Sequence, residues 1–255
     1  MENNEHIETK HHRREKIELT TPAAIIVAGM LIGGSILMGF YWLTGGSSNL
    51  DNPSKTKTEN IADNKVVKND SKDTPTPVTA SDHYLGNQNA PLTLVLYADY
   101  QCPFCGKFFK DVETTINNSY VKNGSLAIVY RDFSFLGSES IKAAEAARCS
   151  GDQNKYWQYH DYLFSHQKGE NQGQFSADNL KSFAKDMGLD TTTFNKCLDS
   201  DKYAKAVIDS TQEGGNAGVQ GTPKGFIMKA GKVVETIDGA EPLDMVTGKL
   251  DKALK

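Results

Sequence analysis

Two cysteines that stand two residues apart, Cys102 and Cys105, are the residues in this sequence best suited to chemistry. They enclose Pro103 and Phe104 and lie between an apolar run of strand length, residues 92–99, and a segment of helical character. This arrangement places Cys102 at the N-terminal end of a helix, where free N–H groups and the helix dipole favour a thiolate. Because a thiolate attacks disulfides, we predict thiol–disulfide exchange. Cys102 is expected to be the exposed attacking sulfur and Cys105 the more buried resolving sulfur.

Metal binding and a purely structural disulfide are the alternatives for this pair. A structural zinc site needs four ligands at compatible spacing, and the chain has no second Cys-x-x-Cys and no His-x-x-x-His. Pro103 suits the first turn of a helix, where its missing N–H does no harm. We therefore predict a redox-active dithiol with no metal and no bound cofactor, with a metal-delivery module as the alternative from another class.

A second candidate element, Thr222-Pro223, comes directly before a predicted β-hairpin. A cis proline in a tight turn that faces the dithiol would leave neighbouring backbone groups free to pair with a substrate chain. The alternative is an ordinary trans proline in a turn. With the dithiol present, we expect the cis form and assign Thr222 and Pro223 to substrate binding.

Two charged residues, Lys224 and Asp99, are candidate auxiliary residues alongside Pro103 and Phe104. A lysine beside the dithiol would favour the thiolate, whereas a solvated lysine would have no role. Asp99 is either a proton acceptor for Cys105 or a surface carboxylate at the end of a strand.

The elements that must position these residues follow from the hydrophobic pattern. Strands are expected at 92–99 and 126–133, a helical block at 138–217, and a β-hairpin at 225–238. The expected helices are 102–118, 141–148, 156–165, 176–187, 191–198, 202–214 and 242–254. The order β-α-β, helical insert, β-β-α is that of an α/β thioredoxin fold with its middle expanded.

The N-terminal part contains an uncharged apolar run, residues 22–43. A helix of this length spans about 33 Å, which matches a bilayer core. Basic residues precede the run closely, and an aromatic group at Phe40-Tyr41-Trp42 closes it. We predict a transmembrane anchor, and a cleaved signal peptide is the alternative, although no Ala-x-Ala site follows. The predicted parts are a cytoplasmic tail (1–21), the anchor (22–43), a disordered linker rich in polar residues (44–81) and a catalytic domain (82–255) with its insert at about 138–217.

Charge and cysteine usage narrow the function further. The 255 residues carry 28 basic and 32 acidic side chains, for a net charge of −4, which gives no electrostatic case for nucleic-acid binding. All four cysteines follow the predicted anchor, and an even count in an exported domain favours disulfides. Pairing of Cys149 with Cys197 as a structural disulfide is the simplest arrangement, and two free buried thiols are the alternative.

Several segments resemble the DsbA-like thiol:disulfide oxidoreductases, and among them the membrane-anchored, BdbD-like subgroup. The segments that carry this resemblance are Tyr97–Cys105, Tyr130–Phe133, Ala143–Ala147, Tyr156–Phe164 and Gly221–Pro223. The resemblance implies a thioredoxin fold with an inserted helical domain and the donation of disulfides to exported, unfolded proteins with thiols. It also implies reoxidation by a membrane quinone-linked thiol oxidase, DsbB-like or VKOR-like. A second disulfide in the insert occurs in some relatives, and Cys149 and Cys197 match its placement.

The sequence departs from the family pattern at two positions. Phe104 stands where the enterobacterial enzyme has a histidine, so it offers no ring N–H to a thiolate, and Lys224 follows the proline where the family usually has threonine. We therefore expect a thiol oxidase that is less oxidising than that enzyme. The predicted location is the cell membrane, single-pass, with the N-terminus cytoplasmic and the catalytic domain outside. A reductase or isomerase is the alternative, but no dimerisation domain precedes Asp82, and we expect a monomer.

Overall fold

The computed structural model describes residues 74–80 and 82–255. The predicted tail and anchor, and the predicted linker as far as residue 73, lie outside the described residues. Among the helices that are described, none is both long and apolar enough to cross a membrane.

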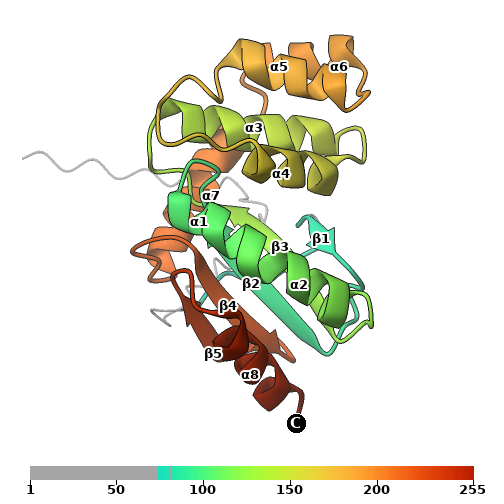
Figure 1. The fold of residues 1–255 in the computed structure, drawn as a ribbon, viewed down its shortest axis with the longest axis vertical. Helices are drawn as coiled ribbons and strands as arrows, with labels where there is room; N and C mark the ends of the chain where they lie inside the picture. The colour runs from blue at the N-terminus through green and yellow to red at the C-terminus, as the bar shows by residue number, and fades with distance from the viewer. Residues whose placement is uncertain (1–73, 81) are drawn as a thin grey trace, which may run out of the picture. The chain divides into compact units, whose positions relative to one another are not determined.

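A five-stranded sheet of order β1-β3-β2-β4-β5 forms the centre of the described domain (Figure 1). β2 and β3 are parallel, and the other neighbouring pairs are antiparallel. The strands are β1 (Tyr84–Leu85), β2 (Leu92–Ala98), β3 (Leu126–Asp132), β4 (Lys224–Lys229) and β5 (Lys232–Asp238). The four predicted strands are confirmed, whereas the two residues of β1 are too few to produce a recognisable alternation.

The alternation of side chains along β2 explains how the sheet is covered on both faces. Leu92, Leu94 and Leu96 lie in one buried cluster with residues of the helix that follows β2 and of the C-terminal helix. Val95 and Tyr97 point the other way, into a second cluster on the opposite face. All five side chains are at most 1% exposed, so β2 is the central strand of the fold.

The helical segment that follows β2 is continuous from Pro103 to Val121 and contains two π-helical turns. Its parts are α1 (Pro103–Phe108), η1 (Phe109–Glu113), α2 (Thr114–Ile116) and η2 (Asn117–Val121). Phe108, Val112 and Ile116 pack on the sheet together with the C-terminal helix α8 (Leu243–Leu254). Cys105 and Phe109 face a different cluster, which belongs to the helical insert. The segment therefore connects the sheet with the insert.

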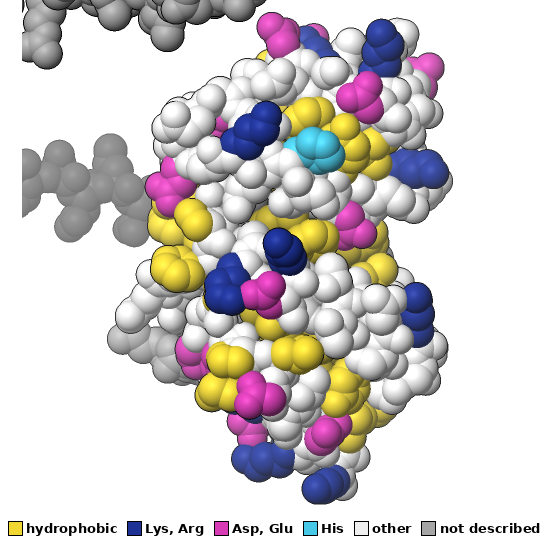
Figure 2. All heavy atoms as spheres, viewed as in Figure 1, with side chains coloured by type: hydrophobic (Ala, Val, Ile, Leu, Met, Phe, Trp, Pro, Cys, Tyr) yellow, Lys and Arg dark blue, Asp and Glu magenta, His cyan; other side chains and the backbone are white. Residues whose placement is uncertain are grey.

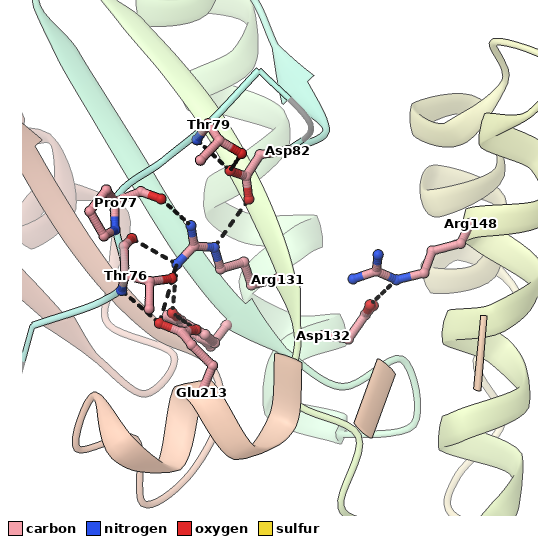
Figure 3. A network of polar contacts seen from close by, with 9 residues as sticks. Thr76, Pro77, Thr79, Asp82, Arg131, Asp132, Arg148 and Glu213 are labelled. Atoms are coloured by element: carbon pink, nitrogen blue, oxygen red, sulfur yellow. Dashed lines mark hydrogen bonds and ion pairs between the residues drawn. The ribbon is translucent and has the colours of Figure 1, made fainter. Parts of the chain in front are cut away.

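The insert is a group of helices, all but the last of which stack beyond one end of the sheet (Figure 1). They are α3 (Ser138–Gly151), α4 (Tyr156–Ser165), α5 (Ala177–Asp186), α6 (Thr191–Asp199) and α7 (Ala204–Asn216). The last helix runs back to the sheet, where its Glu213 accepts from Tyr97 of β2 and Arg131 of β3. Arg148 of α3 donates through Nε to Asp132 at the end of β3, at 2.6 Å (Figure 3). This ion pair, in which the Asp132 side chain is 1% exposed, ties the insert to the sheet.

Residues 74–80, which the sequence analysis assigns to the disordered linker, lie against the folded domain. Arg131 of β3 donates through Nη1 to the backbone and side-chain oxygens of Thr76, at 3.0 and 2.9 Å, and through Nε to Asp82 (Figure 3). Glu213 of α7 accepts from the N–H of Thr76. The predicted boundary at 82 is therefore too late. The segment contributes little apolar surface of its own, so composition alone did not reveal polar contacts that a distant arginine supplies.

Candidate active site

The dithiol occupies the junction between β2 and α1. Cys102 is the N-cap of α1, and Pro103 is the first helical residue, as predicted. Cys102 is 5% exposed and Cys105 is 2% exposed. The expectation of an exposed attacking sulfur is therefore wrong: the Cys102 sulfur lies 3.5 Å from the carbonyl oxygen of Thr222, on the loop that covers it. Phe104, by contrast, is 64% exposed and projects from the site.

The two thiols have opposite acidities. Hydrogen bonding from the Cys105 thiol, followed by interactions with Thr222 and the backbone of Cys105 and Phe104, lowers the pKa of Cys102 to about 6 against the opposing effect of burial. Burial raises the pKa of Cys105, and the neighbouring Cys102 adds to this effect. The polarity agrees with the prediction from the helix start, but the largest contribution comes from the neighbouring thiol and not from the backbone.

The Thr222-Pro223 peptide bond is cis, as predicted. It stands opposite Cys102, beside an open groove of about 400 Å³ that residues 218, 220–224 and 238–239 line. The hydroxyl of Thr222 is buried, and it is one of the groups that lower the pKa of Cys102. The loop thus places the Thr222 carbonyl and hydroxyl next to the dithiol and has a groove beside it, an arrangement that suits an extended chain bound next to Cys102.

Lys224 pairs with a neighbouring strand and not with the dithiol. Its ammonium forms an ion pair with Asp238 and lies 5.3 Å from the centre of the Phe226 ring. This pairing lowers the pKa of the Asp238 carboxyl. The interpretation of Lys224 as a support for the thiolate therefore finds no support, because its charge is paired with Asp238 on the neighbouring strand.

Asp99 is completely buried, so the interpretation as a surface carboxylate is wrong. Burial raises the pKa of its carboxyl, although four hydrogen bonds oppose this effect. The four donors are the hydroxyl of Ser140 and the N–H groups of Gln101, Phe135 and Leu136. Both carboxylate oxygens are occupied, and none of these bonds involves Cys105. Asp99 thus anchors the active-site turn to the start of the insert, and the interpretation as proton acceptor finds no support.

Two residues that the sequence analysis did not single out reach the active-site turn from the connection between α4 and α5. Gln167 donates through Nε2 to the carbonyl oxygens of Tyr100 and Cys102, at 2.7 and 3.0 Å. Asn171 donates its N–H to the side-chain oxygen of Gln101 at 2.6 Å. Single polar residues in a long connection carry no periodic signal, so only the three-dimensional structure reveals them.

The predicted disulfide between Cys149 of α3 and Cys197 of α6 is confirmed, with a Cα–Cα distance of 5.8 Å and a sequence separation of 48. It lies within the buried core of the insert, whereas Cys102 and Cys105 are free thiols. Residues 74–80 and 82–255 contain no group of three or more His, Cys, Asp or Glu side chains arranged to hold a metal ion. On the face shown in Figure 2, charges of both signs are scattered between hydrophobic patches.

Comparison with known proteins gives a consistent result. The pattern that defines the thioredoxin family matches residues 78–246. A putative protein-disulfide oxidoreductase of Rickettsia felis is 27% identical over 179 residues, which cover 70% of this chain and 62% of that protein. The solved structure of oxidised BdbD from Bacillus subtilis has a TM-score of 0.62 and 26% identity, over 73% of this chain and 99% of that one.

A different type of relative shares only the same region. The Na(+)/H(+) antiporter NhaA 1 of Salinispora arenicola is 29% identical over 148 residues, which are 57% of this chain. The match spans only 21% of the antiporter, about a fifth of its length. The shared region is therefore a module that also occurs within a larger protein.

Proposed function

Because this chain belongs to the thioredoxin family, among its DsbA-like members, we propose that it is a thiol:disulfide oxidoreductase that introduces disulfides into exported proteins. The observation that carries this proposal is the difference in pKa between the two thiols of its dithiol. Cys102 has a pKa lowered to about 6, and the pKa of Cys105 is raised. A thiolate of low pKa is a good leaving group, and a stabilised reduced form makes the corresponding disulfide a strong oxidant.

The proposed reaction begins with a disulfide between Cys102 and Cys105. A substrate thiolate attacks the Cys102 sulfur, and the S–S bond breaks, so that Cys105 leaves with the electron pair and takes up a proton. A second thiolate of the substrate then attacks its own sulfur in the mixed disulfide and releases Cys102 as a thiolate. The substrate loses two thiol protons and two electrons, and the dithiol is reduced.

The chain's own residues have distinct roles in this sequence. The Cys105 thiol and Thr222 stabilise the Cys102 thiolate that leaves in the last step. The groove beside the cis Thr222-Pro223 bond would hold the extended substrate on the side of Cys102. Phe104, which is exposed next to the dithiol, would add an apolar contact for an unfolded chain.

We further propose that the domain acts outside a membrane to which residues 22–43 anchor it. The length and the charge-free composition of that run support this placement. The Cys149–Cys197 disulfide supports it independently, because structural disulfides persist in oxidising compartments. The proposed partners are exported proteins with reduced thiols and a membrane quinone-linked thiol oxidase, DsbB-like or VKOR-like, that regenerates the disulfide.

A redox titration combined with a substrate assay tests the proposal. The oxidised full chain in detergent is mixed with a reduced, unfolded protein that has two cysteines, and free thiols are counted over time. We expect stoichiometric oxidation and a potential between about −270 mV, as for thioredoxin, and about −120 mV, as for the enterobacterial DsbA. A potential at or below that of thioredoxin would indicate a reductase. Efficient rearrangement of a scrambled substrate would indicate an isomerase, and tight zinc or copper binding without exchange would indicate metal delivery.

A further inference from the structure

Gln167 connects the helical insert directly to the backbone on both sides of the attacking cysteine. Its side-chain N–H groups donate to the carbonyl oxygens of Tyr100, at 2.7 Å, and Cys102, at 3.0 Å. The Tyr100 side chain is 1% exposed and Gln101 is completely buried, so this turn lies in the interior. A buried carbonyl without a partner is costly. Gln167 donates to the Tyr100 carbonyl, and it is a second donor to the Cys102 carbonyl, so it stabilises the conformation of this turn.

The orientation of this turn decides which groups face the Cys102 sulfur. Cys102 has extended backbone angles (φ −67°, ψ 120°), and its carbonyl also accepts the N–H of Gly106 at 3.0 Å. The backbone of Phe104 and of Cys105 helps to lower the pKa of Cys102. Those contacts require the Cys102 backbone to stay in the conformation that places its sulfur over the start of α1.

Gly106 provides the space for the amide. A Cβ atom at position 106 would overlap the side-chain oxygen of Gln167. Glycine within a helix is about 1 kcal/mol less favourable than alanine, so its presence in α1 needs a local reason. Contact with an amide that holds the neighbouring backbone supplies this reason.

We propose that Gln167 is a positioning residue for thiol–disulfide exchange, through which the helical insert sets the acidity of Cys102. This inference rests on the proposed function. The side chain does not touch the reacting sulfur, and it acts through the carbonyls of Tyr100 and Cys102. Asn171, which bonds to Gln101 from the same connection, reinforces the attachment.

The test measures the pKa of Cys102 in the reduced full chain, from the pH dependence of its alkylation by iodoacetamide. Gln167→Met keeps the length of the side chain but removes both donors. We expect the thiolate fraction at pH 6 to fall about three- to tenfold, as for the loss of one or two hydrogen bonds. Gln172→Met is the matched control, because Gln172 lies in the same connection, is exposed and, among the residues described, donates through Nε2 to the carbonyl of Glu170 alone. It should leave the pKa unchanged.

A second variant tests the same contact from the other side. Gly106→Ala retains Gln167 and favours the helix, but it displaces the amide, so it should also lower the thiolate fraction. An unchanged Cys102 pKa in folded Gln167→Met would overturn the proposal, even if the melting temperature fell. If that variant does not fold, an unchanged pKa in Gly106→Ala overturns it. Alkylation needs no protein substrate, so a wild-type chain that fails to oxidise substrates would refute the proposed function without deciding this result.

Discussion

The two cysteine pairs of this chain lie in the same buried cluster, yet they have different environments. Cys149 and Cys197 join two helices of the insert through a disulfide and pack among apolar side chains. Cys102 and Cys105 stand at the start of α1, opposite the Thr222-Pro223 loop, which has a groove beside it. Both pairs are almost completely buried, so exposure does not distinguish the reactive pair from the structural one.

The two pairs differ in the hydrogen-bond donors around the sulfur atoms and in the groove beside them. The Cys105 thiol, Thr222 and the backbone at the start of α1 lower the pKa of Cys102 to about 6. A groove lined by Thr222 and Pro223 lies beside the loop whose Thr222 carbonyl is 3.5 Å from this sulfur. The Cys149–Cys197 disulfide instead closes a loop of 48 residues, and a disulfide across a long loop restricts the unfolded chain.

The largest expected effect is on the rate of substrate oxidation, which should depend on Cys102 and Cys105 and not on Cys149 and Cys197. Cys102→Ser should lower the rate of substrate oxidation more than about a thousandfold, because a hydroxyl does not replace a thiolate in disulfide exchange. The Cys149→Ala/Cys197→Ala double variant should keep the rate per folded molecule within about twofold, since neither sulfur takes part in the exchange. The measurement is the initial rate of thiol loss from a reduced, unfolded substrate. A comparable loss of rate in the insert variant would mean that the second pair belongs to the catalytic cycle.

The second prediction concerns stability, for which the Cys149–Cys197 pair is expected to be the important one. Removing the Cys149–Cys197 bond should lower the free energy of unfolding by about 4 kcal/mol at most, as expected for a closed loop of 48 residues. Urea unfolding of the double variant and of the wild-type chain, both with Cys102 and Cys105 reduced, measures the difference. A loss below about 0.5 kcal/mol would show that the unfolded insert is already restricted without the bond.

Sequence reasoning succeeded where the signal is local and periodic. The four longer strands, the insert helices and the dithiol at a helix start follow from spacing and hydrophobic pattern, and the pairing of Cys149 with Cys197 is the simplest arrangement. It failed where a residue is defined by a distant partner. The sequence leaves Lys224, which follows Pro223, as either a support for the thiolate or a solvated charge, but an acidic residue on the next strand, Asp238, binds it.

The burial of Asp99 and the role of Gln167 were equally inaccessible to sequence reasoning. Asp99 lies at a strand end, a position that is usually exposed, but the insert folds over it and supplies Ser140 as a donor. Gln167 lies 65 positions from Cys102, and no pattern relates the two. An inserted domain thus changes the environment of active-site residues, and the sequence next to those residues does not show the change.

The third prediction concerns pH and uses the reactive pair alone. The pKa of Cys102 in the folded, reduced chain, about 6, lies below the value of about 8.5 for a free thiol. A depressed pKa contributes stability that is complete above the unfolded value and is lost as the pH falls towards the folded value. The melting temperature of the reduced chain should therefore fall, relative to the oxidised chain, between about pH 8.5 and pH 6.

Thr222→Val provides the control for this pH dependence. It removes the hydroxyl that helps to lower the pKa of Cys102, so the change in relative melting temperature should become smaller. Scanning calorimetry of both redox forms, at several pH values and with Cys149–Cys197 intact, gives the difference directly. Equal slopes for the two redox forms of the wild-type chain would contradict a depressed Cys102 pKa.

The smallest expected effect tests whether a nearby charge distinguishes the two pairs. Lys224 is two residues from the cis peptide bond's threonine, but its ammonium is bound by Asp238 and is not among the groups that shift the pKa of Cys102. Lys224→Met should therefore change that pKa by no more than about 0.3 units, as for a charge that is already paired and screened. Asp238→Asn is the matched variant, because it removes the ion-pair partner of Lys224, so that the unpaired ammonium could lower the pKa of Cys102. Alkylation of Cys102 as a function of pH in both variants measures the effect. An increase of a full unit in Lys224→Met would show that the charge reaches the dithiol in solution, and the reactive pair would then owe part of its acidity to electrostatics and not only to its hydrogen-bond donors.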